Sequence, residues 1–308
     1  MSRVEPDAPD APRAPWSLAP PPPGRRIELP GRGTTFVREV PGPPGAPAVL
    51  LLHGWMASGG LNWFRAFDAL GTRFRVVAPD HRGHARGLRA DGCFRLADCA
   101  DDVAALVGAL GIRSAVAVGY SMGGPVAQLL WRRHPHLVDG LVLCATAHGF
   151  VADGLPRTLF GAGVAAATGA ARAGGRVARV PAALGRSLLP RPARRPSLLP
   201  AWAAAELGRH HWPTLVEAAH ALTGYSAEPW IRTVDVPTAV MVTTRDRLLP
   251  AGAQAATARA LPGASVHLLD RGHGACVSPD FGARVLVACE DVVERIAPGT
   301  ARATRVAS

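Results

Sequence analysis

The stretch Gly119-Tyr120-Ser121-Met122-Gly123-Gly124 is the part of the sequence that decides the fold. It follows an apolar run at residues 115–118, typical of a buried parallel strand, and it precedes an apolar-periodic pattern typical of a helix. A serine between glycines at such a strand-to-helix corner matches G-x-S-x-G, the nucleophile elbow. Gly119 and Gly123 let strand and helix approach closely, which presents Ser121 beside the first free N–H groups of the helix. The alternative interpretation is a purely structural turn.

The composition describes a globular chain without a run long enough to span a membrane. Its 308 residues, 48% of them apolar, can form one large α/β domain or two smaller ones. The net charge of +11 comes from arginine alone, and only 6% of residues are aromatic. Nucleic-acid binding favours basic residues interleaved with aromatic ones, so we expect no nucleic-acid partner. The five cysteines form no C-x-x-C pair, which favours reduced thiols and a cytoplasmic location.

Apolar runs alternate with helical patterns along most of the chain. This pattern predicts an α/β fold, with a mostly parallel central sheet and helices on both faces. The expected strands are a hairpin at 26–30 and 34–40, then 48–52, 74–78, 115–118, 141–144, 238–242 and 265–269. The expected helices cover approximately residues 62–70, 96–110, 251–260 and 279–296, besides the one after the elbow.

The alternation also predicts how the chain is divided. Residues 26–146 and 233–298 are expected to form the core, and residues 147–232, which lack a convincing strand, a helical lid inserted into it. The proline-rich residues 1–25 predict a disordered tail rather than a secretory signal, and residues 299–308 a flexible C-terminal tail.

A serine nucleophile needs a base, and the base needs an acid that orients it. Asp246 and His273 each directly follow an apolar strand downstream of the elbow, and catalytic groups of open α/β sheets gather at such strand ends. The order Ser121, Asp246, His273 is the order of a serine hydrolase on an α/β scaffold. Asp270 and Asp235 are the alternatives for the acid. Asp270 lies awkwardly close in sequence to His273, and Asp235 precedes its strand, so Asp246 is preferred.

Two backbone N–H groups are candidates to stabilise the oxyanion that forms on an attacked carbonyl. One belongs to Met122, directly after the serine. The other belongs to Trp55, in the His53-Gly54-Trp55 segment that follows a buried strand, where Gly54 permits a close turn. We interpret His53 as a residue that braces this loop rather than as a second base.

These motifs resemble the α/β-hydrolase fold family, in particular its single-domain, lid-bearing esterases, perhydrolases and epoxide hydrolases. The resemblance extends over residues 47–297 and depends on residues 53–55, 80–84 and 119–124, with Asp246 and Gly272-His273. It implies a Ser–Asp–His triad, backbone donors at Trp55 and Met122, and a variable lid. The family's D-x-R-G-x-G-x-S pattern is incomplete here: residues 80–87 read D-H-R-G-H-A-R-G, without the second glycine and the serine.

The nucleophile type selects among the activities of this family. Epoxide hydrolases and haloalkane dehalogenases resemble the chain but use aspartate at the elbow, so Ser121 favours a small-molecule acyl or ester substrate, with a hydrophobic substrate as one interpretation. We expect a carboxylesterase-like hydrolase that works through an acyl-enzyme. An acyltransferase or perhydrolase, and a hydrolase of carbon–carbon bonds, are alternatives on the same scaffold. A non-catalytic, hydrolase-like binding protein is the alternative from another class.

No cofactor and no metal are expected. The histidines His210, His211 and His220 have no carboxylate at a ligand-like spacing, and acyl transfer by a serine needs no cofactor. The predicted lid is basic, with Arg172, Arg176 and Arg179 on one face of a helical pattern. A solvated helix face is the simpler interpretation. The sharper hypothesis is that these arginines attract an acidic substrate or an anionic membrane surface.

Overall fold

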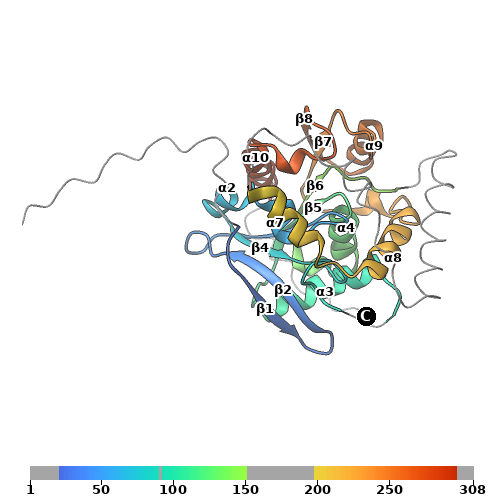
Figure 1. Ribbon diagram of the computed structural model, residues 1–308. Coiled ribbons are helices and arrows are strands. Elements are labelled where there is room, and N and C mark those ends of the chain that lie inside the picture. Colours follow the sequence, from blue (N-terminus) through green and yellow to red (C-terminus); the bar gives the residue numbers. More distant parts are fainter. Residues whose placement is uncertain (1–20, 90–91, 151–197, 297–308) are drawn as a thin grey trace, which may run out of the picture.

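The computed structural model describes residues 21–89, 92–150 and 198–296. Its centre is an eight-stranded sheet in the order β1-β2-β4-β3-β5-β6-β7-β8 (Figure 1). β1 and β2 form an antiparallel hairpin, β2 pairs antiparallel with β4, and all other neighbours are parallel. The predicted α/β fold with a mostly parallel sheet is therefore confirmed. The strands are β1 (Gly24–Leu29), β2 (Gly33–Val40), β3 (Ala48–Leu52), β4 (Arg75–Pro79), β5 (Ala115–Tyr120), β6 (Val138–Cys144), β7 (Thr238–Thr243) and β8 (Ser265–Leu269).

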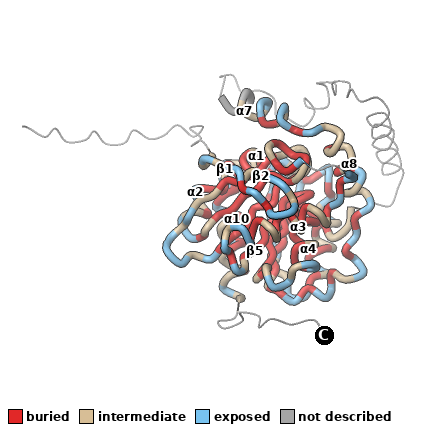
Figure 2. The backbone as a smooth tube through the Cα atoms, turned by 90° about the horizontal axis from the view of Figure 1, so that it is seen from below, coloured by how far each residue is buried: buried red, intermediate tan, exposed pale blue. Residues whose placement is uncertain are grey.

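Helices cover both faces of this sheet, which explains the continuous apolar runs of its central strands. Alternate residues of β3 enter different cores: Leu50 and Leu52 pack with α3 and α4, and Val49 and Leu51 with α2 and α10. Every residue of β3, β5 and β7 is buried, and the buried segments gather at the centre of the molecule in Figure 2. The helices are α1 (Gly59–Trp63), α2 (Phe67–Gly71), α3 (Leu96–Ala109), α4 (Gly123–Arg133), α7 (Leu198–Leu207), α8 (Trp212–Thr223), α9 (Ala251–Ala260) and α10 (Phe281–Glu294).

Besides shifts of up to three residues at the ends of elements, such as β6, which begins at Val138, the structure differs from the prediction at two places. The single helix expected at residues 62–70 is two short helices, α1 and α2, separated by a turn at residues 64–66. α10 packs directly on this turn, because a Cβ added at Gly282 would lie 2.1 Å from the Arg65 carbonyl oxygen. At the N-terminus, β1 begins at Gly24, so the last residues assigned to the tail belong to the sheet.

Most of the predicted lid lies outside the described residues, as do its arginines Arg172, Arg176 and Arg179. The same holds for residues 1–20 and 297–308, so the lid and both tails stay predictions. The part of residues 147–232 that is described includes α7 and α8, which contact the loops after β3 and β4. In Figure 2, α7 lies on the side of α1, and α8 lies beside α3.

The chain departs from the D-x-R-G-x-G-x-S pattern in the loop after β4. Ala85, at the position of the second glycine, has a φ of +40°, a left-handed conformation that costs an alanine roughly 1–2 kcal/mol. Gly87 replaces the serine, and a Cβ there would lie 2.1 Å from the His81 carbonyl oxygen. The backbone of this loop thus passes where a side chain at residue 87 would collide. The Asp80 carboxylate holds the loop by accepting the N–H groups of Gly59 and Arg86.

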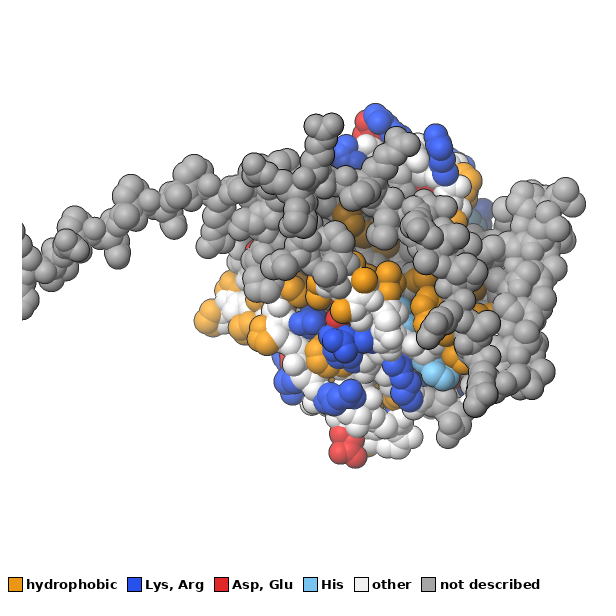
Figure 3. All heavy atoms as spheres, viewed as in Figure 1, with side chains coloured by type: hydrophobic (Ala, Val, Ile, Leu, Met, Phe, Trp, Pro, Cys, Tyr) orange, Lys and Arg blue, Asp and Glu red, His pale blue; other side chains and the backbone are white. Residues whose placement is uncertain are grey.

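Much of the arginine charge in the described residues is paired with carboxylates. Figure 3 shows arginine side chains on the viewed face, interspersed with apolar ones. Arg82 contacts both Asp98 and Asp102, and Arg133 contacts Asp101. None of the helices among the described residues is both long and apolar enough to cross a membrane.

Candidate active site

The turn between β5 and α4 has the geometry that its sequence predicts. Ser121 has a φ of +51°, which is uncommon for a residue with a side chain and is typical of a strained functional turn. A Cβ at Gly119 would lie 2.3 Å from the Gly123 carbonyl oxygen, and one at Gly123 would lie 2.0 Å from that of Leu52. Only glycine fits at either position. The turn is fixed from β6, because the Ser121 N–H donates to the Cys144 carbonyl oxygen at 3.0 Å.

Ser121, His273 and Asp246 are joined in a row by hydrogen bonds. The Ser121 Oγ lies 3.0 Å from Nε2 of His273, and Nδ1 of His273 lies 2.8 Å from Oδ2 of Asp246. A carboxylate accepts but does not donate, so Nδ1 carries the proton and Nε2 is free to accept the serine proton. The Asp246 side chain is fully buried, whereas that of His273 is 24% exposed. The base is therefore accessible and its acid is not.

Asp246 is held as an anion by donors on every side. Its Oδ1 accepts the N–H groups of Leu248 and Leu249, each at 2.9 Å, and its Oδ2 accepts the Thr243 hydroxyl at 2.8 Å. Burial alone would raise the pKa of Asp246. The hydrogen bonds from His273, Leu249 and Thr243 outweigh burial and lower the pKa, so the carboxylate is charged at neutral pH.

The other two candidate acids lie elsewhere. Asp270 forms an exposed ion pair with Arg245. Asp235 accepts a hydrogen bond from the indole of Trp131 at 3.2 Å. Of the three aspartates that the sequence offers, the structure brings Asp246 to the imidazole.

The loop after β3 lies directly against the serine. A Cβ at Gly54 would be 3.3 Å from the Ser121 Cβ, so this glycine permits the close approach. The Gly54 N–H donates to Oδ1 of Asn62 at 2.9 Å, which fixes the loop to α1. Met122 is the buried N-cap residue of α4, where backbone N–H groups lack helical acceptors. The two residues predicted to supply oxyanion donors thus flank the serine, one as its neighbour in sequence and the other next to Gly54.

His53 joins this loop to the loop after β4. Its Nδ1 lies 2.8 Å from the Gly54 carbonyl oxygen, and its Nε2 accepts the His81 N–H at 2.9 Å. Burial lowers the pKa of His53 well below its usual value, so the ring is neutral. A neutral ring with both nitrogens bonded to the backbone has the geometry of a bracing residue.

Sequence reasoning missed three residues that complete the site. The Tyr120 hydroxyl donates to the His273 carbonyl oxygen. Gln254 in α9 accepts the Thr243 N–H at 3.0 Å and donates to the Asp246 carboxylate at 3.3 Å. Thr243 and Gln254 are both fully buried, but no periodic pattern in the sequence marks either residue as part of the site.

Within the described residues, no three His, Cys, Asp or Glu side chains are arranged to hold a metal ion.

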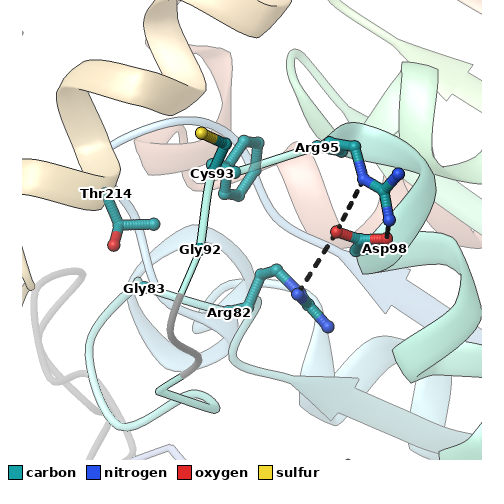
Figure 4. Close-up of a pocket in the computed structure, with 8 residues that line it drawn as sticks. Arg82, Gly83, Gly92, Cys93, Arg95, Asp98 and Thr214 are labelled. Atoms are coloured by element: carbon teal, nitrogen blue, oxygen red, sulfur yellow. Dashed lines mark hydrogen bonds and ion pairs between the residues drawn. The ribbon is translucent and has the colours of Figure 1, made fainter.

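A cavity of about 310 Å³ lies between the Cys93–Arg95 loop, Arg82 and α8, apart from the hydrogen-bonded row. Figure 4 shows Thr214 on one side of it and the ion pairs of Asp98 with Arg82 and Arg95 on the other. Its lining contains none of the three residues of the hydrogen-bonded row.

A family model described as the alpha/beta hydrolase fold matches residues 47–279 of this chain. The chain is 35% identical over 127 residues to the bifunctional esterase/perhydrolase of Acinetobacter calcoaceticus, a match that covers 39% of this chain and 46% of that protein. It is 38% identical over 109 residues to the pimeloyl-acyl-carrier-protein methyl ester esterase of Sodalis glossinidius, a match that covers 34% of this chain and 39% of that protein. The chain thus spans less than half the length of these curated relatives.

A solved structure extends the likeness of fold over most of the molecule. The thermophilic esterase from Thermogutta terrifontis, with malate bound, matches with a TM-score of 0.69 and 24% identity, covering 89% of this chain and 99% of that one. The family model covers more than half of the sequence. The chain belongs to the α/β-hydrolase fold family.

Proposed function

We propose that this protein is a serine hydrolase that cleaves a carboxylic ester, or a related acyl substrate, through an acyl-enzyme. The observation that supports it is the row Ser121–His273–Asp246, with contacts of 3.0 and 2.8 Å. Nucleophile, base and orienting acid stand within hydrogen-bonding distance in the order that acyl transfer requires. The relatives named as esterases support the same reaction class.

In this mechanism the Ser121 hydroxyl attacks the substrate carbonyl carbon while Nε2 of His273 takes its proton. Asp246 stabilises the imidazolium that forms and keeps its Nδ1 proton in place. The backbone N–H groups of Trp55 and Met122 stabilise the oxyanion, each worth roughly 3 kcal/mol in the transition state. His273 then protonates the leaving alkoxide oxygen as the bond between that oxygen and the acyl carbon breaks. Water, deprotonated by the same imidazole, attacks the acyl-enzyme and releases the acid.

Hydrolysis of p-nitrophenyl esters of graded chain length tests the proposal. Wild-type protein is expected to hydrolyse a subset of them and to be labelled covalently by a fluorophosphonate. Ser121→Ala is expected to lose both properties, because no other hydroxyl stands beside His273 in the described row. Activity that survives Ser121→Ala would overturn the proposal. A folded wild-type protein that resists the fluorophosphonate would instead favour a non-catalytic binding protein.

Transfer of the acyl group to peroxide is a second candidate, supported by the similarity to a protein named esterase/perhydrolase. It needs the same acyl-enzyme and differs only in the group that attacks it. Adding hydrogen peroxide or an alcohol to an ester assay separates the two. A preference for peroxide or alcohol well above its molar ratio to water would identify a transferase or perhydrolase.

A further inference from the structure

Two polar side chains of the loop that follows β3 bind the α7–α8 segment. The indole Nε1–H of Trp55 donates to the Leu215 carbonyl oxygen in α8 at 2.8 Å. The Ser58 hydroxyl donates to Oε2 of Glu206 in α7 at 2.9 Å. The loop on which the proposed oxyanion donor lies is thus bound at both ends by residues about 150 positions away in the sequence.

The carboxylate of Glu206 is buried and paired. Only 1% of its side chain is exposed, and both of its oxygens accept from Arg86, at 2.9 and 2.6 Å. Burial opposes ionisation of Glu206, but the hydrogen bonds from Arg86 and Ser58 outweigh it and lower the pKa. A buried ion pair of this kind adds little net stability compared with an apolar contact, and its clearest use is to fix one arrangement.

The bonds around Glu206 close into a ring that includes the loop. Ser58 bonds to Glu206, and Glu206 to Arg86. The Arg86 N–H donates to Asp80, and Asp80 accepts the N–H of Gly59, next to Ser58. Because each member is bonded to the next, a shift of α7 would be transmitted to the start of α1.

The backbone between the two anchors is strained. Met56 has a φ of +56°, in the left-handed region that residues other than glycine rarely adopt. Such a conformation persists only where the surroundings impose it. Met56 lies between the anchors at Trp55 and Ser58, which hold the loop on either side of it.

We propose that the α7–α8 segment positions the oxyanion donor at Trp55, with Glu206 and the Trp55 indole as positioning residues. The proposal builds on the proposed function, because it assumes that the Trp55 N–H stabilises an oxyanion formed on Ser121. It gives the two anchoring contacts on α7 and α8 a role in the reaction. Release of either anchor relaxes the loop and moves the donor, while Ser121, His273 and Asp246 keep their contacts.

The test uses Trp55→Phe, which removes the indole N–H and keeps an aromatic ring, and Glu206→Gln, which removes the charge on Glu206. Both are assayed on the best p-nitrophenyl ester and with a trifluoromethyl ketone, whose adduct with a serine carries an oxyanion. We expect kcat to fall about tenfold with KM within about twofold, since the donor acts only in the transition state. Inhibition by the ketone is expected to weaken by the same factor.

Glu217→Gln is the matched control. Glu217 in α8 accepts the N–H of Phe94 at 2.8 Å, so it also ties this segment to the core, but away from the loop after β3. It is expected to retain kcat and the ketone affinity. A merely structural role would lower the thermal midpoint of all three variants and leave kcat and ketone affinity unchanged while they are folded. If Glu206→Gln does not fold, Trp55→Phe decides the question.

Wild-type kcat and ketone affinity in folded Trp55→Phe would overturn the proposal, and so would equal losses in Glu217→Gln. Ser121→Ala separates this failure from that of the proposed function. If Ser121→Ala is inactive and Trp55→Phe is normal, only the positioning role is wrong. If Ser121→Ala stays active, the serine mechanism fails and the positioning role fails with it.

Discussion

The hydroxyl of Tyr120 donates a hydrogen bond to the main-chain oxygen of His273, so the residue before the serine holds the loop of the histidine. The Tyr120 ring also packs edge-on against Trp63 and Phe281 in the core below. The distance from serine to imidazole is therefore set by a direct tie between the end of β5 and the loop after β8, and not by the sheet alone.

Tyr120→Phe is expected to lower kcat about tenfold, because the imidazole loop loses its tie to the elbow while the aromatic packing stays. The free energy of unfolding should fall by about 1 kcal/mol, the usual contribution of one hydrogen bond. The control is Tyr225→Phe, which removes a buried hydroxyl bonded to Gln128 at 3.0 Å. Tyr225→Phe should lower the free energy of unfolding by a similar amount and leave kcat unchanged. Equal kcat values in the two variants would contradict the role given to Tyr120. Ester kinetics and urea unfolding supply both measurements.

Asp246→Asn is expected to reduce kcat by about 10³- to 10⁴-fold, because an amide neither stabilises the imidazolium nor holds its Nδ1 proton. Asp270→Asn is the comparison: its carboxylate is exposed and pairs with Arg245. That variant should stay within about twofold of wild type, since surface ion pairs contribute little. A large loss in Asp270→Asn with normal activity in Asp246→Asn would reverse the assignment of the acid.

Alanine should have opposite effects at two glycines. At Gly123 the added Cβ would lie 2.0 Å from the Leu52 carbonyl oxygen, so we expect a loss of more than about 3 kcal/mol or failure to fold. At Gly252, an exposed position of α9, nothing lies within 4 Å, and alanine should stabilise by about 0.5–1 kcal/mol. Urea midpoints measure both changes. A tolerated Gly123→Ala would mean that strand and helix can separate at the elbow.

Stability should fall in mild acid because four histidines are buried in their neutral form. Burial lowers the pKa of His81 to about 3 and of His210 to about 4, and those of His53 and His84 well below their usual value. The unfolded chain binds these protons near pH 6.5 and the folded chain does not, so stability is lost as the pH falls below about 6.5, by up to about 1.4 kcal/mol per pH unit for each histidine. Urea midpoints between about pH 7.5 and pH 5 measure the loss.

Protonation of Asp80 has the opposite effect on stability in mild acid, because burial raises the pKa of Asp80 to about 6. The folded protein takes up that proton before the unfolded chain does, which offsets the effect of one histidine between about pH 6 and pH 4. His81→Asn should make the decline with pH shallower, and His136→Asn, at an exposed histidine, should not change it. An unchanged slope in His81→Asn would show that the His81 ring is protonated in the folded state.

The sequence predicts the central strands well because β3, β5 and β7 are buried on both faces and therefore read as continuous apolar runs. The runs at 48–52 and 265–269 become β3 and β8 with the same bounds, although alternate residues of β8 are exposed. The prediction of a single helix over residues 62–70 is wrong for a physical reason. The break in this helix depends on the backbone of α10, which arrives from the far end of the chain and is invisible to local periodicity.

The row of site residues is similarly visible in sequence, because Ser121, Asp246 and His273 each follow an apolar strand. The groups that orient them are not. Gln254 lies in α9, a helix of alanine, glycine and polar residues without an apolar stripe, and Glu206 contacts Ser58 across 148 positions. Side-chain hydrogen bonds between remote elements leave no periodic pattern, so only coordinates reveal them.

The contact between Ser121 and His273 joins residues 152 positions apart, and β6 and β7 lie between their strands in the sheet. A refolding chain can form the β1–β2 hairpin and most of its helices from local contacts, but this pair closes only after β6, β7 and β8 have added to β5. Closing such long loops is slow. In a refolding experiment, ester hydrolysis would therefore return later than the circular dichroism of the helices, and enzymatic activity becomes a reporter of the last strand to join.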